Sequence, residues 1–197
     1  MQQSGSSLQQ QTFVGIIVLL LAAFSAGYFV GHGSAPGSGG IVAAGRDTDL
    51  ACWFSPSGGC TDAVVAETAG AAKTIQVLSY TFTSRPIANA LIDAHRRGVS
   101  VTVVADKSET IDVRSEIKSL LRAGIPVYID DKHGIAHNKV MVIDGATVIT
   151  GSFNFTHAAE FENADNVLIV HNHPAIASAY ADNFAHHLSH SDRYSGS

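Results

Sequence analysis

One segment of the sequence, residues 137 to 154 (HNKVMVIDGATVITGSFN), combines apolar residues with polar side chains that are suited to anion chemistry. These side chains belong to His137, Lys139, Ser152 and Asn154. An imidazole can act as a nucleophile or a base, an ammonium group supplies positive charge, and hydroxyl and amide groups supply hydrogen bonds. The combination predicts a site that binds and attacks a phosphate-sized anion.

The apolar runs on either side of Asp144-Gly145 predict a β-hairpin, because this dipeptide is typical of two-residue hairpin turns. In that register Lys139 faces Thr150, His137 faces Ser152, and the four side chains share one face of the sheet. A three-residue loop would separate them. A histidine in a strand can be purely structural, but a buried lysine without a partner is costly, and this favours an anion-binding role.

In six residues and their spacing, this segment resembles the HKD signature of the phospholipase D superfamily: His137, Lys139, Asp144, Gly151, Ser152 and Asn154. The resemblance extends through LSYTFTS, ALIDAHRRGVSVTVVAD and NFTHAAEFENADNVLIV, and it covers nearly all of the predicted folded domain. In length and order, the chain is most similar to the bacterial endonucleases that carry a single motif and to the cardiolipin hydrolases.

The resemblance implies a role for each matching side chain. His137 would attack phosphorus and form a phosphohistidine, while a second motif histidine protonates the leaving oxygen and later activates water. Lys139 and Asn154 would hold the phosphoryl oxygens with help from Ser152, so that neither a metal nor another cofactor is needed. Asp144 lies at the turn, which suits a structural or orienting role.

Only one copy of the motif is present, so the resemblance implies a homodimer whose active site is shared across the two-fold axis. Family members also place a carboxylate after the second hairpin strand, commonly a Glu before an Asn, to orient the histidine. The matching dipeptide is Asp165-Asn166, which makes Asp165 the candidate for this role. Glu160 and Glu162 are interpreted as surface residues.

Around the hairpin, helix and strand patterns alternate. Helices are predicted at 61–73, 84–98, 113–124 and 174–189, and strands at 74–82, 99–106, 125–130 and 166–171. This order predicts an α/β fold, an α-β-α sandwich with a mixed, largely parallel sheet. It is also the phospholipase D/nuclease fold that the resemblance implies.

The chain of 197 residues begins with three segments that precede the predicted domain at 46–197. Residues 1–12 are a polar tail, residues 13–30 are an uncharged apolar run, and residues 31–45 form a Gly/Ser-rich linker. The apolar run predicts a hydrophobic helix that anchors the chain in a membrane, with an exported periplasmic or extracellular domain. A signal segment that is cleaved to release a secreted protein is the alternative.

Two cysteines, Cys52 and Cys60, flank a Pro/Gly-containing loop that could close on a disulfide in an exported domain, and two reduced thiols are the alternative. Lys107 and Arg114 flank a loop after a predicted strand and are candidates for lining a substrate groove. The histidines around His186 and His190 resemble a metal-binding tract, but no carboxylate or cysteine lies at ligand spacing nearby. The sequence therefore predicts no metal site.

The net charge is -5, which is not typical of a protein that coats long nucleic acid. The favoured hypothesis is a metal-independent phosphodiesterase that acts as an endonuclease on DNA or RNA. A membrane-anchored phospholipase D that hydrolyses phospholipid head groups is the alternative. A hypothesis of another class is a catalytically silent dimer that binds anions.

Overall fold

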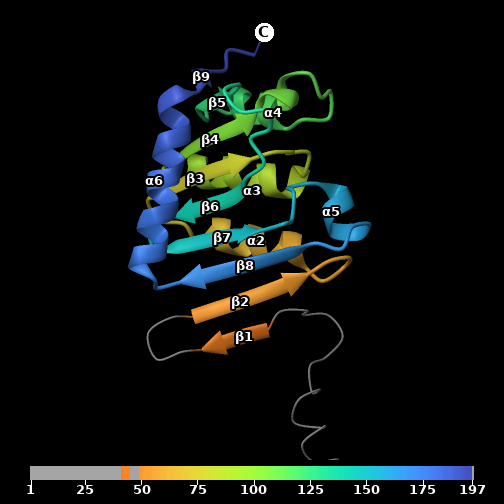
Figure 1. Cartoon of the computed structure of the whole chain (residues 1–197), viewed down its shortest axis with the longest axis vertical. Coiled ribbons are helices and arrows are strands. Elements are labelled where there is room, and N and C mark those ends of the chain that lie inside the picture. Colours follow the sequence, from red (N-terminus) through yellow and green to blue (C-terminus); the bar gives the residue numbers. More distant parts are fainter. Residues whose placement is uncertain (1–40, 45–48, 197) are drawn as a thin grey trace, which may run out of the picture. The chain divides into compact units, whose positions relative to one another are not determined.

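A mixed β-sheet runs through the part of the chain that the structure, a computed structural model, describes: residues 41–44 and 49–196 (Figure 1). Within these residues it has nine strands in the order β1-β2-β8-β7-β6-β3-β4-β5-β9. The strands are β1 (Ile41–Ala44), β2 (Asp49–Phe54), β3 (Thr74–Ser79), β4 (Ser100–Asp106), β5 (Val127–Asp130), β6 (Lys139–Ile143), β7 (Thr147–Gly151), β8 (Asn166–His171) and β9 (Asp192–Arg193).

Helices cover both faces of the sheet, as the α-β-α prediction requires. On one face lie α2 (Cys60–Gly70), α3 (Arg85–Arg96) and α4 (Ile117–Arg122), which share a large apolar core with the strands. On the other face, α6 (Pro174–His190) runs across the strands (Figure 1) and packs on β3 to β7. The short helix α5 (His157–Phe161) follows β7 at one end of the sheet.

The prediction of a largely parallel sheet is wrong. Among the described strands, β4 pairs in parallel with β3 and β5, whereas all other neighbouring strands are antiparallel. Parallel pairs need crossover connections, which α3 and α4 supply between β3, β4 and β5. The hairpin and the strands after it have shorter or differently routed connections, and these produce antiparallel pairs.

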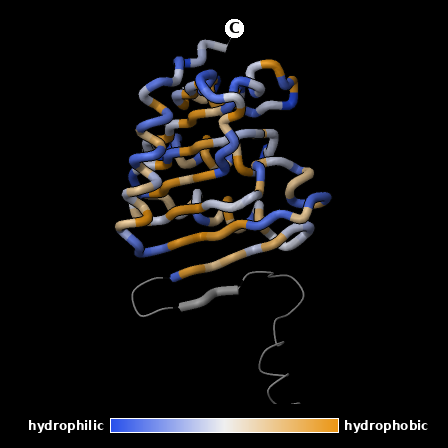
Figure 2. The backbone as a smooth tube through the Cα atoms, viewed as in Figure 1, coloured by the Kyte–Doolittle hydropathy of each residue, from blue (hydrophilic) through white to orange (hydrophobic). Residues whose placement is uncertain are grey.

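The centre of the sheet is apolar on both faces, and Figure 2 shows the hydrophobic colour along the central strands. In β4, Val103 and Ala105 join the core beneath α2, α3 and α4, while Val104 faces α6 and packs with Phe184. A strand that is buried on both faces needs apolar residues at successive positions, which explains the continuous run at 99–106.

The hairpin between β6 and β7 has a three-residue loop, 144–146, so the predicted two-residue register is wrong. Met141 pairs with Ile149, and Ile143 pairs with Thr147. Thr150 therefore does not face Lys139, and its hydroxyl lies 3.5 Å from that of Tyr180 on α6. The polar residues do not gather on one strand face but at the ends of β6 and β7.

The longer loop has a physical cause in the carboxylate of Asp144. It accepts hydrogen bonds from the main-chain N–H groups of Ala72, Lys73 and Thr74 at 2.8, 2.7 and 2.8 Å. Burial opposes ionisation of this carboxylate, but these hydrogen bonds outweigh it and lower the pKa of Asp144. The structural role expected for Asp144 is thus to fasten the hairpin to the connection between α2 and β3.

The predicted membrane segment, residues 13–30, lies outside the described residues, as do 1–12 and most of the linker. In the part of the chain that the structure describes, no helix is long and apolar enough to span a bilayer. Residues 41–44, expected within the linker, instead form the strand β1, which pairs with β2. The sheet therefore begins a few residues before the predicted domain boundary.

The disulfide expected between Cys52 and Cys60 is not formed. Cys60 starts α2 and is a free thiol that is fully buried in the core. Trp53 on β2 packs against the same core. Because neighbouring residues of a strand point to opposite faces, the side chain of Cys52 is directed away from Cys60.

Candidate active site

His137 lies in the connection between β5 and β6, two residues before β6 begins, and its side chain is exposed. Its ring packs against the ring of Tyr80 with a centroid distance of 4.7 Å. Tyr80 directly follows β3, and its main-chain N–H donates to the Asn138 oxygen at 2.9 Å. Tyr80 belongs to the LSYTFTS stretch of the family resemblance, but the sequence pattern implied no role for it.

Lys139, the first residue of β6, is buried with only 6% of its surface exposed. Its ammonium nitrogen donates to the main-chain oxygen of His137 at 2.7 Å and lies 5.0 Å from the centre of the Tyr80 ring. Burial lowers the pKa of Lys139 to about 8, and the negative charge of Asp165 partly opposes this effect. An ammonium group has three donors, so a bound anion could accept the remaining ones.

Ser152 and Asp165 form a second part of the site, beyond the ends of β7 and β8. The Ser152 hydroxyl donates to Asp165 Oδ1 at 2.8 Å and accepts from the main-chain N–H of Asn166 at 3.1 Å. Among the described residues, the Asp165 carboxylate accepts a hydrogen bond from Ser152 and not from His137. Its role as the orienter of a histidine stays a prediction, whereas its charge acts on Lys139.

Gly151 ends β7 at a close approach between two main-chain segments. Its φ is 150°, and a Cβ atom at this position would collide with the main-chain oxygen of Asn166. The same oxygen accepts the main-chain N–H groups of Ser152 and Phe153 at 3.2 Å each. A glycine is therefore required here for Ser152 to reach its position.

Asn154 lines a pocket of about 570 Å³ together with polar residues that include Thr81, Thr83 and Thr156. Its side-chain Oδ1 is buried and has no hydrogen-bond partner among the residues that the structure describes. Buried polar atoms are normally satisfied, so this amide oxygen is an acceptor that a donor group of a ligand can engage.

Contacts between two segments bring Asn154 to the same end of the sheet as Tyr80. Phe82 and Phe155 form an isolated β-bridge, and their ring centroids lie 5.6 Å apart. The main-chain N–H of Thr83 also donates to the Phe155 oxygen at 2.9 Å. The segment after β3 therefore contacts His137 at one point and the segment that carries Asn154 at another.

The two candidates for a substrate groove differ in their positions. Arg114 lines the pocket next to Asn154 and a neighbouring pocket of about 440 Å³, and it pairs with Asp112 at 3.3 Å. Lys107 instead donates to the main-chain oxygen of His133 at 2.9 Å. The geometry thus favours Arg114 over Lys107 as a substrate contact.

The interpretation of Glu160 as a surface residue is wrong. Only 5% of its surface is exposed, and its carboxylate accepts hydrogen bonds from the N–H groups of Gly59 and Thr61 at 3.0 and 2.6 Å. It caps the start of α2, where a negative charge is stabilised by free main-chain N–H groups. Glu162 has an exposed side chain and lines the larger pocket.

The open mixed sheet has helices on both faces, and a His-x-Lys pair and a Gly-Ser-x-Asn segment lie at the ends of the adjacent strands β6 and β7. This combination defines the class of HKD-motif proteins. Residues 64–188 match the family model described as "Cardiolipin synthase, PLD-like domain". The chain belongs to the phospholipase D superfamily, which confirms the resemblance seen in the sequence.

Individual relatives agree with this assignment. A protein of Rickettsia bellii named phospholipase D is 42% identical over 131 residues, which are 66% of this chain and 65% of that protein. The mitochondrial cardiolipin hydrolase of Xenopus laevis is 37% identical over 115 residues, 58% of this chain and 54% of that one. The chain thus spans slightly less than two thirds of the Rickettsia relative and about half of the Xenopus relative.

Among solved structures, the phospholipase D family member Nuc from Salmonella typhimurium superimposes with a TM-score of 0.71 at 32% identity. The match covers 75% of this chain and 98% of that chain. The open mixed sheet described above is therefore the fold of this family.

Proposed function

We propose that the protein is a metal-independent phosphodiesterase in which the imidazole of His137 attacks phosphorus. The observation that carries this proposal is the pairing of an exposed imidazole with the buried ammonium group of Lys139, which has donors left for an anion. The positive charge would stabilise the charge that develops on the phosphoryl oxygens. The side-chain NH2 group of Asn154, at the wall of the neighbouring pocket, would donate a further hydrogen bond to them.

The reaction proceeds in two displacements. In the first, a lone pair on a ring nitrogen of His137 forms the bond to phosphorus, and the bond from phosphorus to the leaving oxygen breaks. A second imidazole gives its proton to that oxygen. In the second displacement, this imidazole takes a proton from water, the water oxygen bonds to phosphorus, and the bond to His137 breaks.

The second imidazole is proposed to be the His137 of another copy of the chain, in a homodimer with a two-fold axis at the shared site. Four large apolar side chains are exposed on segments that flank the site: Ile111, Val113, Ile135 and Phe161. Exposed apolar groups of this kind are typical of surfaces that bind a partner. They support association at the end of the sheet where His137 lies.

Nucleic acid is the proposed substrate. The resemblance in size and single-motif architecture to the endonuclease members supports this choice. The polar lining of the pocket next to Asn154, with Thr81, Thr83 and Arg114, suits a phosphodiester backbone better than an acyl chain.

Phospholipid is the second candidate substrate. The Rickettsia relatives are named phospholipase D. Ile111 and Val113, which are 84% and 96% exposed, could enter a lipid surface instead of a dimer interface. For either substrate, we propose that residues 13–30 hold the chain at a membrane and that the domain is exported. The alternative is that these residues act as a signal that is removed on secretion.

The test compares substrates under one set of conditions. The purified chain is incubated in EDTA with plasmid DNA, single-stranded DNA and RNA, and vesicles of phosphatidylcholine or cardiolipin, with the His137→Asn variant as the blank. Cleavage of nucleic acid alone supports the endonuclease, and release of head groups alone supports the phospholipase. Turnover of neither would leave the silent anion-binding dimer. Turnover lost in EDTA while the melting temperature of the chain stays unchanged would contradict a metal-free reaction.

A further inference from the structure

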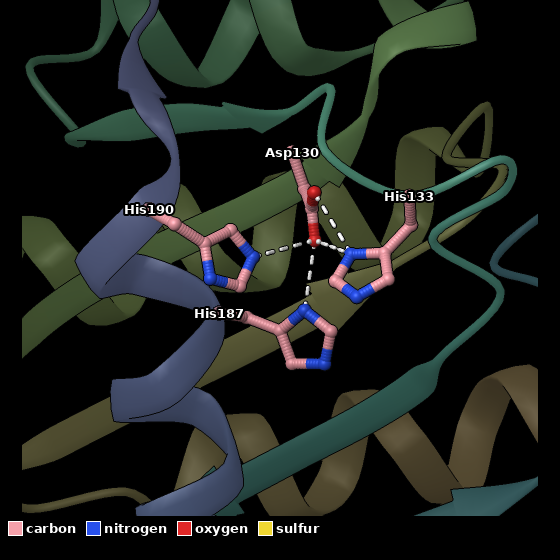
Figure 3. A group of neighbouring side chains, drawn as sticks. All are labelled: Asp130, His133, His187 and His190. Atoms are coloured by element: carbon pink, nitrogen blue, oxygen red, sulfur yellow. Dashed lines mark hydrogen bonds and ion pairs between the residues drawn. The ribbon is translucent and has the colours of Figure 1, made fainter.

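A cluster of three histidines surrounds a buried carboxylate on the side of the sheet that α6 covers (Figure 3). Asp130 is the last residue of β5 and is fully buried, and His133 follows in the next connection. His187 and His190 lie in the last turn of α6. One potential ligand atom from each of these residues lies within 4.8 Å of every other.

All three imidazoles contact the same oxygen atom, Asp130 Oδ2. The distances are 2.8 Å from His187 Nδ1, 2.9 Å from His133 Nδ1 and 3.3 Å from His190 Nε2. The ring centroids are 5.1, 5.3 and 5.5 Å apart, so the rings form a nearly regular triangle around this oxygen.

Hydrogen bonds alone account poorly for this arrangement. If the rings were all protonated, three positive charges would face one buried carboxylate; if they were neutral, three N–H groups would have to converge on one oxygen. A divalent cation resolves both problems, because it binds the carboxylate and the unprotonated nitrogen of each neutral imidazole at once.

We propose that Asp130, His133, His187 and His190 bind one structural divalent metal ion, with zinc as the favoured ion. Nitrogen and oxygen ligands of zinc lie about 2.0–2.2 Å from the metal, so neighbouring ligand atoms of a tetrahedral site are about 3.3 Å apart. The contacts of 2.8 to 3.3 Å between Asp130 Oδ2 and the three nitrogens are close to this spacing. The ligand atoms all lie within 4.8 Å of one another, so the most widely separated ones would have to move closer together around the ion.

The coordination would be complete without water, since four protein ligands fill a tetrahedral site. Zinc sites that are closed in this way are structural, whereas catalytic sites keep a position open for water or substrate. The prediction from sequence that no carboxylate accompanies the C-terminal histidines is corrected here, because Asp130 lies 57 residues before His187 in the chain. The ligands read as Asp-x2-His on one segment and His-x2-His on the other.

Groups outside the cluster hold the ligands in place, as is usual for metal sites. The main-chain N–H of Lys132 donates to the other oxygen of Asp130 at 3.1 Å. The second ring nitrogen of His187 lies 3.4 Å from the side-chain amide of Asn138. Asn138 stands between His137 and Lys139, so a metal here would fasten α6 to the connection that carries the proposed nucleophile.

The test uses the full-length chain without an affinity tag, first stripped with EDTA and then titrated with zinc chloride. We expect one zinc ion per chain after gel filtration and a higher melting temperature with zinc, because an ion that binds only the folded state stabilises it. Cobalt(II) as a probe should give the intense visible absorption of a four-coordinate site. A chain that retains no zinc after gel filtration, or that gives only the weak absorption of a six-coordinate cobalt ion, would overturn the proposal.

Substitutions locate the ion. His190→Ala and Asp130→Asn should weaken zinc binding about 100-fold or more, since even residues outside the coordination sphere contribute about 10- to 100-fold. His171→Ala is the matched control, because His171 pairs with Glu67 and is not part of the cluster. If the Asp130 variant fails to fold, His133→Ala, at a side chain that is 43% exposed, provides the measurement. Equal zinc affinity in His133→Ala, His190→Ala and the unchanged chain would refute the site.

Discussion

The ammonium nitrogen of Lys139 donates a 2.7 Å hydrogen bond to the main-chain oxygen of His137, two residues before it in the chain. This bond places a positive charge beside the proposed nucleophile without using the imidazole itself. The imidazole stays exposed against Tyr80, and the ammonium group stays buried. The two side chains can therefore act on one anion from different sides.

Replacing His137 by asparagine should abolish turnover, because an amide cannot form the covalent intermediate. We expect a loss of at least about 10³-fold, which is in the range seen when a nucleophile is removed. Initial rates on the preferred substrate measure the effect. His171→Asn, at a histidine that pairs with Glu67 away from the site, serves as the control and should keep its activity. Retained turnover in His137→Asn would assign the nucleophile to another residue.

Replacing Lys139 by methionine should separate stability from activity. The pKa of Lys139 is lowered to about 8 by burial, so below this pH the folded state bears the full cost in stability of the buried charge. Methionine removes this penalty, and we expect the free energy of unfolding at pH 7 to rise by about 1–3 kcal/mol while turnover is lost. Urea unfolding measures the change. A variant that is less stable than the unchanged chain would contradict the unfavourable burial of this charge.

The same group predicts an alkaline limit for catalysis. The ammonium form persists below its pKa of about 8, so kcat/KM should fall as the pH rises through this value. In the same window the unfolded chain binds more protons than the folded one, so stability should rise as activity falls. Lys139→Arg, whose guanidinium group does not titrate in this pH range, is the control. The residual kcat/KM of this variant should not fall as the pH rises through about 8. A flat profile up to pH 10 would exclude Lys139 as the titrating group.

Replacing Asp144 by alanine should destabilise the hairpin. Three main-chain N–H groups lose a charged acceptor, and we expect a loss of about 2–3 kcal/mol at pH 7. The pKa of this carboxylate is lowered in the folded state, so its contribution is present above the ordinary value of 3.8 and is lost as the pH falls below it. The two proteins should therefore converge in acid. Asp182→Ala, at an exposed position on α6, is the control and should change stability little.

A shared active site makes the activity of mixed dimers non-additive. If both His137 side chains serve one phosphorus atom, a dimer with one His137→Asn subunit should be inactive. Co-expression of equal amounts of both subunits should then leave about a quarter of the activity per chain, instead of about half for independent sites. Sedimentation of the mixture verifies that dimers are present. An active species that sediments as a monomer would contradict the shared site.

Much of the fold could be predicted from local patterns. The apolar run of β4 reflects burial on both faces, and the period of apolar residues in α3 reflects one buried face. The hairpin itself was predicted, but its loop length was not, because Asp144 is bonded to residues about 70 positions earlier in the chain. The prediction of mainly parallel strands also failed, since the apolar pattern of one strand does not define which strand lies next to it or in which direction that neighbour runs.

The site shows the same division. His137, Lys139 and Asn154 were proposed as site residues from the motif, and the structure places them at the same end of the sheet. Tyr80 and Glu160 could not be assigned, because an aromatic side chain and a carboxylate acquire their roles only from contacts with distant segments. The ligands around Asp130 were missed for the same reason.

The sheet ends at β9, a strand of two charged residues, Asp192 and Arg193, that covers part of β5. So short and charged a border offers few main-chain groups to a neighbouring molecule, which protects proteins of this kind from edge-to-edge aggregation. Further copies of the chain are therefore discouraged from extending the sheet into a fibre at this border. Removing the last six residues would uncover β5 and make it available for such stacking.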